Sequence, residues 1–163
     1  MSVNNFRPHL LVLPEDDANR QLANGFLLDE TLDLRAIQLL PNAGGWAKVR
    51  DVFKTVHAKE LSNYGTRYMV LLVDFDEETR RGDQLRAVVP QDLTERVFVL
   101  GVWSEPEDLK RAGLGSLETV GRELARECRG GSRTLWNHRL LQHNATVLDR
   151  LTQIVRPFLF PAS

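Results

Sequence analysis

Short apolar runs alternate along the chain with segments whose apolar residues recur at helical spacing. Four runs are apolar enough to be strands buried on both faces, and they cover His9–Leu13, Leu34–Leu40, Tyr68–Val73 and Arg96–Trp103. Helical spacing between them predicts core-facing helices through Leu22, Phe26 and Leu27, and then through Val49, Val52, Phe53 and Val56. Because strands that alternate with amphipathic helices form βαβ units, we expect a parallel sheet with right-handed crossovers.

The last third of the chain has helical stripes and no convincing strand. One stripe consists of Leu117, Val120, Leu124 and Cys128, and a second covers Val147–Val155, which we expect Pro157 to end. No internal repeat and no long linker divides the sequence. We therefore predict an α/β fold with helices on both faces of the sheet, in one domain over residues 1–163. Residues 8–110 form its core, and residues 111–163 form a helical extension packed on that core.

Composition narrows the class of protein without identifying it. The 163-residue chain is 42% hydrophobic and 26% charged, as soluble globular proteins are. Lys and Arg number 21 against 22 Asp and Glu, which excludes a generally basic nucleic-acid coat but not a local basic patch. The single Cys128 excludes an internal disulfide framework and a cysteine-based zinc site. No apolar run has membrane-spanning length and Met1–Pro8 is polar, so we expect a cytoplasmic protein without a membrane span.

Carboxylates follow three of the four predicted strands. Glu15 comes after the first strand, Asp74 and Asp76 after the third, and Glu105 after the fourth. Because the carboxyl ends of parallel strands share one edge of the sheet, where ligands bind, we expect these side chains to meet there. In an extended segment Asp74 and Asp76 point to the same side, while Phe75 points to the other.

Crowded carboxylates favour a bound cation. Each pair of like charges a few Å apart repels by about 1 kcal/mol even in bulk water, and a divalent ion reverses the sign. Oxygen ligands select hard ions, so the sequence predicts Mg²⁺ or Mn²⁺ at Glu15, Asp74 and Asp76, with Glu105 as a further ligand. The alternative is that acids after strands cap helices, which is the role we predict for Asp16 and Asp17.

A Glu after the first strand and an Asp-x-Asp after a later apolar strand resemble the Toprim domain over about residues 8–110. The resemblance implies a Toprim-like three-layer αβα fold with a mainly parallel four-stranded sheet. It implies acid/base work or metal binding by Glu15, and Mg²⁺ ligation by Asp74 and Asp76. The chain departs from the family pattern at Asp16, where a Gly is usual, and in lacking the common Gly after the Asp-x-Asp.

The resemblance also narrows the reaction. Topoisomerases of this family need a nucleophilic Tyr on a separate domain, whereas Tyr64 and Tyr68 lie on or beside the third predicted strand. Primases of the family need a zinc module and a longer chain. The segment Val99–Leu109, with Glu105, is similar to the acidic region after the fourth strand of the nuclease branch. The resemblance is therefore nearest to the small or overcoming-lysogenization-defect-type Toprim nucleases, and it implies metal-dependent hydrolysis of phosphodiester bonds in nucleic acid.

Basic side chains in two segments are candidates for contact with the substrate. They are Arg80 and Arg81 after the Asp-x-Asp, and His138, Arg139 and His143 near the C-terminus. The alternative for the first segment is an exposed helical face of mixed charge. The alternative for the second is structural, with Trp136 closing the core and Asn144 capping the next helix.

Two further functions fit the same residues. The start Leu-Val-Leu-Pro-Glu-Asp-Asp also resembles a response-regulator receiver domain, in which an acidic pair holds Mg²⁺, Asp74 accepts a phosphoryl group and Ser104 is the switch hydroxyl. Against it, the distance in sequence from Glu15 to Asp74 is longer than receivers use, and no Lys ends a fifth strand. The other alternative is a Toprim-like module without catalysis that binds a partner protein such as an ATPase.

Overall fold

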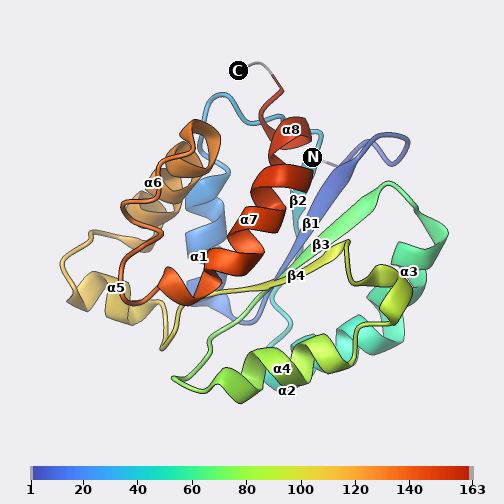
Figure 1. Cartoon of the computed structure of the whole chain (residues 1–163), viewed down its shortest axis with the longest axis horizontal. Helices are drawn as coiled ribbons and strands as arrows, with labels where there is room; N and C mark the ends of the chain where they lie inside the picture. The colour runs from blue at the N-terminus through green and yellow to red at the C-terminus, as the bar shows by residue number, and fades with distance from the viewer. Residues whose placement is uncertain (1, 162–163) are drawn as a thin grey trace.

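The chain forms an α/β fold with an all-parallel sheet, as the sequence predicts (Figure 1). The computed structural model describes residues 2–161. Four strands, β1 (His9–Pro14), β2 (Ile37–Leu39), β3 (Arg67–Leu72) and β4 (Val97–Leu100), lie in the order β2-β1-β3-β4. The helices are α1 (Asp17–Phe26), α2 (Trp46–Val52), α3 (Ala58–Asn63), α4 (Thr79–Ala87), α5 (Glu107–Arg111), α6 (Leu117–Gly130), α7 (Ala145–Ile154) and α8 (Arg156–Leu159). Over residues 2–161, no helix combines the length and the apolarity that crossing a bilayer requires.

Helices cover both faces of the sheet and give three layers (Figure 1). Successive strand residues face opposite sides, so Leu10 and Val12 of β1 pack in one core and Leu11 and Leu13 in the other. The first core also contains Ala23 of α1, Ala125 of α6, Leu151 of α7 and Leu159 of α8. The second contains Val49 of α2, Leu61 of α3 and Leu85 of α4. The C-terminal helices therefore help to build one complete layer of the fold.

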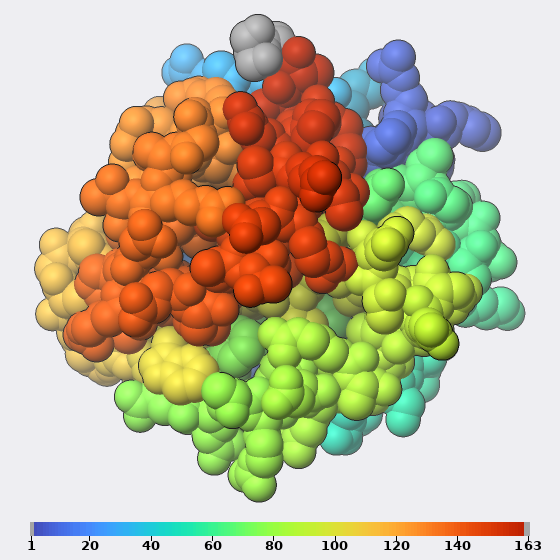
Figure 2. Space-filling view, in the orientation of Figure 1, coloured from blue at the N-terminus to red at the C-terminus, as the bar shows by residue number. Residues whose placement is uncertain are grey.

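The C-terminal layer packs closely on the rest of the molecule. In Figure 2 the orange-to-red C-terminal segment lies directly over the sheet, and little of the sheet is visible behind it. Within this layer, Gly25 of α1 and Gly121 of α6 allow the two helices to approach closely, because a Cβ on Gly121 would overlap the carbonyl oxygen of Leu22. Cys128 of α6 packs against the same core, and burial raises the pKa of its thiol to about 11.

The segment from Trp136 to Asn144 has the structural roles that the sequence left open. Trp136 is buried, and its indole N–H donates to the carbonyl of Leu124 in α6 at 3.2 Å. Asn144 precedes α7, but its side chain does not cap that helix. It pairs instead with the backbone of Gly101, donating to the carbonyl at 2.9 Å and accepting from the N–H at 3.2 Å. Asn144 thus ties the C-terminal layer to the end of β4.

Two predicted details are wrong. Val56 is 48% exposed rather than in the core, because Phe53–His57 forms a π-helical turn between α2 and α3. The wider turn breaks the spacing that would have continued the apolar stripe. Pro157 does not end the C-terminal helical segment, since it lies in the first turn of α8. The backbone N–H groups of a first helical turn have no partner within the helix, so a proline there removes no hydrogen bond.

Candidate metal centre

Three carboxylates meet where β1 and β3 end. Glu15 directly follows β1, Asp16 is the N-cap of α1, and Asp74 follows β3. One oxygen from each lies within 4.8 Å of the others. We call Glu15, Asp16 and Asp74 the carboxylate cluster. The parallel pairing of β1 with β3 brings its members together across a long stretch of sequence.

Asn19 connects two members of the cluster, and the sequence analysis missed it. Its side-chain amide is buried and donates to Asp16 Oδ1 at 2.9 Å and to Asp74 Oδ1 at 2.8 Å. Asp16 Oδ1 also accepts from the Asn19 backbone N–H at 3.0 Å, which confirms Asp16 as the cap of α1. Asn19 lies three residues after the N-cap Asp16, and a polar residue at that capping position is the signal that could have identified it.

Glu15 is the buried member of the cluster. Its side chain is 7% exposed, and Oε2 accepts a 3.4 Å hydrogen bond from the N–H of Asp74. Within the described residues, Oε1 is buried without any hydrogen-bond partner. The Glu15 carbonyl accepts from the N–H groups of Gly44 and Gly45 at 2.9 and 3.0 Å. The backbone is therefore fixed while one carboxylate oxygen remains unsatisfied.

Burial and mutual repulsion disfavour negative charge in the cluster. Burial, and after it the charge of Asp74, raise the pKa of Glu15 to about 8. Burial also raises the pKa of Asp74 to about 6, although the hydrogen bond from Asn19 opposes this shift. A hard divalent cation accepts oxygen ligands and would offset both effects. The donor set and the unpartnered Glu15 oxygen thus fit Mg²⁺ or Mn²⁺.

Asp76 lies outside the cluster, contrary to the expected extended segment. Asp76 and Glu77 adopt left-handed backbone conformations, with φ of 52° and 59°. Their N–H groups donate to Ser104 and Trp103 carbonyls at 3.3 and 2.7 Å, so the chain turns sharply after Phe75. The carboxylate of Asp76 consequently forms an ion pair with Arg81 at 3.0 Å.

Glu105 is also engaged elsewhere. It lies before α5, where its carboxylate pairs with Arg111 at 2.9 Å, and its side chain is 45% exposed. Arg111 bonds Asp108 as well, so Glu105 belongs to an exposed ion-pair group at the start of α5. Of the four carboxylates predicted to meet, the cluster contains Glu15 and Asp74, and Asp16 completes it.

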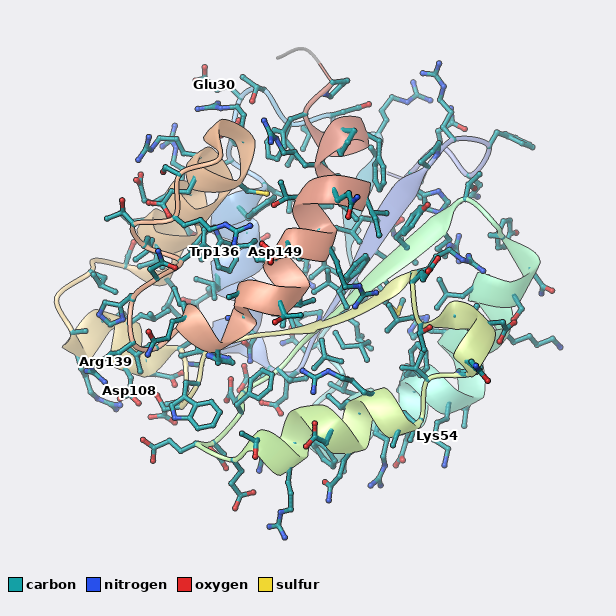
Figure 3. All side chains as sticks on the ribbon, in the orientation of Figure 1. Glu30, Lys54, Asp108, Trp136, Arg139 and Asp149 are labelled. Atoms are coloured by element: carbon teal, nitrogen blue, oxygen red, sulfur yellow. The ribbon has the colours of Figure 1, made fainter. Side chains whose placement is uncertain are left out.

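The predicted basic residues separate into one near the cluster and four with other contacts. Arg81 lies 3.9 Å from Glu15 Oε1, whereas the neighbouring Arg80 is exposed and lies 3.7 Å from Glu78. His138 accepts a hydrogen bond from the backbone N–H of Leu140 at 3.1 Å. Arg139 lies near Asp108 (Figure 3), and its positive charge contributes to lowering the pKa of that carboxyl, behind the hydrogen bonds from Ser104 and Arg111.

His143 packs among aromatic rings. Its ring centroid lies 4.7 Å from that of Phe75 and 5.3 Å from that of Trp103. Both ring nitrogens are buried and have no hydrogen-bond partner within residues 2–161. Burial lowers the pKa of His143; the backbone of Gly101 opposes this in part, and the charge of Arg86 adds to it. The structural alternative therefore describes His143 better than contact with a phosphate.

Comparison of the chain with protein-family models, with curated proteins and with solved structures finds no match. The Toprim resemblance accordingly stays a prediction that depends on Glu15, Asp74 and Asp76. The geometry of the carboxylate cluster is independent of that resemblance.

Proposed function

We propose that the protein is a Mg²⁺- or Mn²⁺-dependent phosphodiesterase that hydrolyses nucleic acid, with the metal held by Glu15, Asp16 and Asp74. The observation that carries the proposal is Oε1 of the buried Glu15, which has no hydrogen bond within residues 2–161 and only a 3.9 Å contact with Arg81, in a cluster whose oxygens lie within 4.8 Å of one another. A buried carboxylate oxygen without a donor is costly unless a cation binds it. The resemblance to Toprim nucleases supports nucleic acid as the substrate.

The residues around the cluster have distinct tasks in this proposal. A divalent ion in such a site supplies polarisation of the phosphate and activation of water. Asn19 fixes the oxygens of Asp16 and Asp74 through one amide, so that two ligands keep a common geometry. Gly44 and Gly45 hold the backbone of Glu15. Without a cation, Glu15 holds a proton on its carboxyl group, because its pKa is raised to about 8.

End-labelled DNA and RNA, single-stranded and structured, test the proposal with Mg²⁺, Mn²⁺ or EDTA. We expect slow cleavage with either metal, none with EDTA, and loss of cleavage in Glu15→Gln and Asp74→Asn. Asp17→Asn is the matched control, because Asp17 is an exposed acid beside Asp16 whose carboxylate accepts from Gln21. Absence of cleavage, together with a melting temperature indifferent to both metals, would contradict the proposal.

Phosphoryl acceptance by Asp74 is a second candidate function. Asp16 beside Glu15 supplies the adjacent acid pair that the receiver resemblance requires. Two observations favour hydrolysis: Ser104 donates to Asp108 at 2.6 Å, and within residues 2–161 the sheet has no fifth strand to carry a Lys. Acetyl phosphate separates the two functions, since a receiver takes its phosphoryl group onto Asp74 and releases acetate. We expect no stable labelling of Asp74.

A further inference from the structure

The left-handed turn after β3 brings Asp76 to Arg81. Two consecutive non-glycine residues with positive φ are strained, and such conformations persist where the surrounding structure holds them. Here the backbone carbonyls of Trp103 and Ser104 hold the turn. The turn places Asp76 Oδ2 3.0 Å from Arg81 Nη2. The strained turn therefore positions the Asp76–Arg81 ion pair beside the carboxylate cluster.

Arg81 extends from α4 to the cluster and still faces solvent. Its Nη1 donates to the carbonyl of Asp74 at 3.4 Å and lies 3.9 Å from Glu15 Oε1. A guanidinium has five N–H donors, and 28% of the Arg81 side chain is exposed. The Arg81 guanidinium can therefore receive an anion at the border of the cluster without breaking its contact with Asp76.

Trp46 forms the other side of this border. The guanidinium carbon of Arg81 lies 5.7 Å from the Trp46 ring centroid, and that of Arg50 lies 5.5 Å from it. Trp46 begins α2 directly after Gly44 and Gly45, whose N–H groups are bonded to the Glu15 carbonyl. The same anchor thus fixes the Trp46 ring and the buried Glu15. Arg81 thus lies between the carboxylate cluster and the Trp46 ring, which also carries Arg50.

We infer that Arg81 binds a phosphate group of the substrate beside the metal carboxylates, and that Asp76 is the positioning residue for Arg81 rather than a metal ligand. This inference rests on the proposed function, because it requires a phosphodiester at the cluster. The guanidinium fork matches two phosphate oxygens, which an ammonium group does not. Asp76 keeps that fork from collapsing onto Glu15, whose Oε1 is its nearest alternative partner.

Oligonucleotide binding and metal binding separate the role of Arg81 from that of the cluster. The probe is a short fluorescein-labelled single strand, of DNA or RNA, with Ca²⁺ in place of Mg²⁺, followed by fluorescence anisotropy. We expect Arg81→Gln and Asp76→Asn to weaken binding by about tenfold or more, the range of one lost charge-assisted contact. We expect Arg81→Lys to lose most of the affinity of the wild type for the probe. Asp76→Glu should bind the probe more tightly than Asp76→Asn and less tightly than the wild type. The Mn²⁺-induced rise in melting temperature persists in all four variants.

Arg80→Gln is the matched control, since Arg80 is the preceding residue of α4 and is exposed beside Glu78. We expect it to bind the probe like the wild type. Melting each variant identifies loss of folding.

Loss of the Mn²⁺ response in Asp76→Asn would make Asp76 a metal ligand and overturn the inference, and so would unchanged probe binding by a folded Arg81→Gln. If the wild type cleaves nucleic acid while Arg81→Gln binds normally, the inference alone fails. If the wild type neither binds the probe nor responds to Mn²⁺, the proposed function fails with it.

Discussion

At the scale of single residues, the carboxylate cluster destabilises the folded protein when no cation is bound. Glu15 is buried beside Asp74, and its Oε1 lacks a hydrogen bond within the described part of the chain. Natural proteins keep such arrangements where function requires them, at a cost in stability. The cost is visible in the raised pKa values of both carboxyls.

Glu15→Gln should therefore stabilise the metal-free protein. The substitution keeps the shape of the side chain and removes the cost of keeping a buried carboxyl protonated well above its ordinary pKa, which burial and the charges of Asp74 and Asp16 raise. Without Glu15 as ligand, added Mn²⁺ should no longer raise the melting temperature, whereas the wild type gains about 2.7 kcal/mol at a hundredfold excess over Kd. Thermal melting in EDTA and in Mn²⁺ measures both effects. Asp17→Asn should behave like the wild type, and a lower melting temperature for Glu15→Gln in EDTA would contradict the prediction.

Part of the cluster could be predicted at this scale and part could not. Glu15 and Asp74 each follow an apolar strand, and parallel pairing of the strands is sufficient to bring them together. The position of Asp76 depends on a turn held by Trp103 and Ser104, which the chain reaches only much later. A period-two pattern assumes extended backbone and contains no sign of that turn. Asp16 both caps α1 and belongs to the carboxylate cluster, and the sequence pattern allowed us to predict only the cap.

At the scale of elements, β1 and β3 were predictable because each is a nearly continuous apolar run that is buried over most of its length. The bounds of β2 were less so. The predicted Leu34–Leu40 is a strand only over Ile37–Leu39, where it pairs with β1. Leu34 is 43% exposed, so its apolar side chain extended the predicted strand wrongly. The π-helical turn at Phe53–His57 was likewise invisible to a pattern that assumes uniform helical spacing.

Gly121→Ala should separate α6 from α1 and destabilise the protein. A Cβ at this position overlaps the Leu22 carbonyl oxygen and approaches the Phe26 backbone at 2.9 Å. Backbone cannot yield as a flexible side chain does, so we expect a loss of about 1–3 kcal/mol or more. Gly130→Ala in the same helix meets nothing within 4 Å and is the control. Urea denaturation measures both variants, and equal stabilities would contradict close packing of the two helices.

The pairing of β1 with β3 should make stability depend on pH through His9. His9 is fully buried; its Nδ1 lies 2.8 Å from the Arg7 carbonyl, and its Nε2 accepts from Arg67 at 3.0 Å. Burial lowers the pKa of His9, the Arg7 bond opposes this, and the charge of Arg67 adds to it. The unfolded chain then binds more protons, so the stability contribution present above about pH 6.5 is lost as the pH falls.

Urea midpoints measured from about pH 5 to 8 test this dependence. His9→Gln should gain stability relative to the wild type as the pH falls; Glu15, Asp74, His57 and His143 also titrate in this range, but they are common to both proteins. The difference between the two curves therefore isolates His9. Curves for the wild type and His9→Gln that run parallel across this range would contradict the prediction.

At the scale of the whole molecule, the C-terminal helices are part of the fold and not an appendage. Leu151, Val155, Leu159 and Phe160 lie in the core that contains Leu10 and Val12 of β1. Their helical stripe was predictable from spacing, because it continues over several turns. The attachment through Asn144 was not, since it joins an isolated amide to the backbone of Gly101.

Truncation after His143 should therefore prevent cooperative folding. It removes five large core side chains, Leu148 included, and each fully buried one contributes about 1.5–3 kcal/mol. Their sum is comparable to the whole stability of a typical domain, about 5–15 kcal/mol. Calorimetry or near-ultraviolet circular dichroism of the truncated chain measures the effect. A sharp melting transition at the wild-type temperature would contradict it.

The rate at which the Cys128 thiol is chemically modified reports how often this layer opens. The thiol packs on α6 against the core, and burial keeps it protonated at neutral pH. Only the thiolate reacts with disulfide reagents, so Cys128 is modified only after α6 has separated from the core and exposed the thiol to solvent. Because the sequence contains a single cysteine, the reaction reports one site without any engineering. Comparing its rate with the rate of global unfolding reveals whether the C-terminal layer opens alone or only together with the sheet.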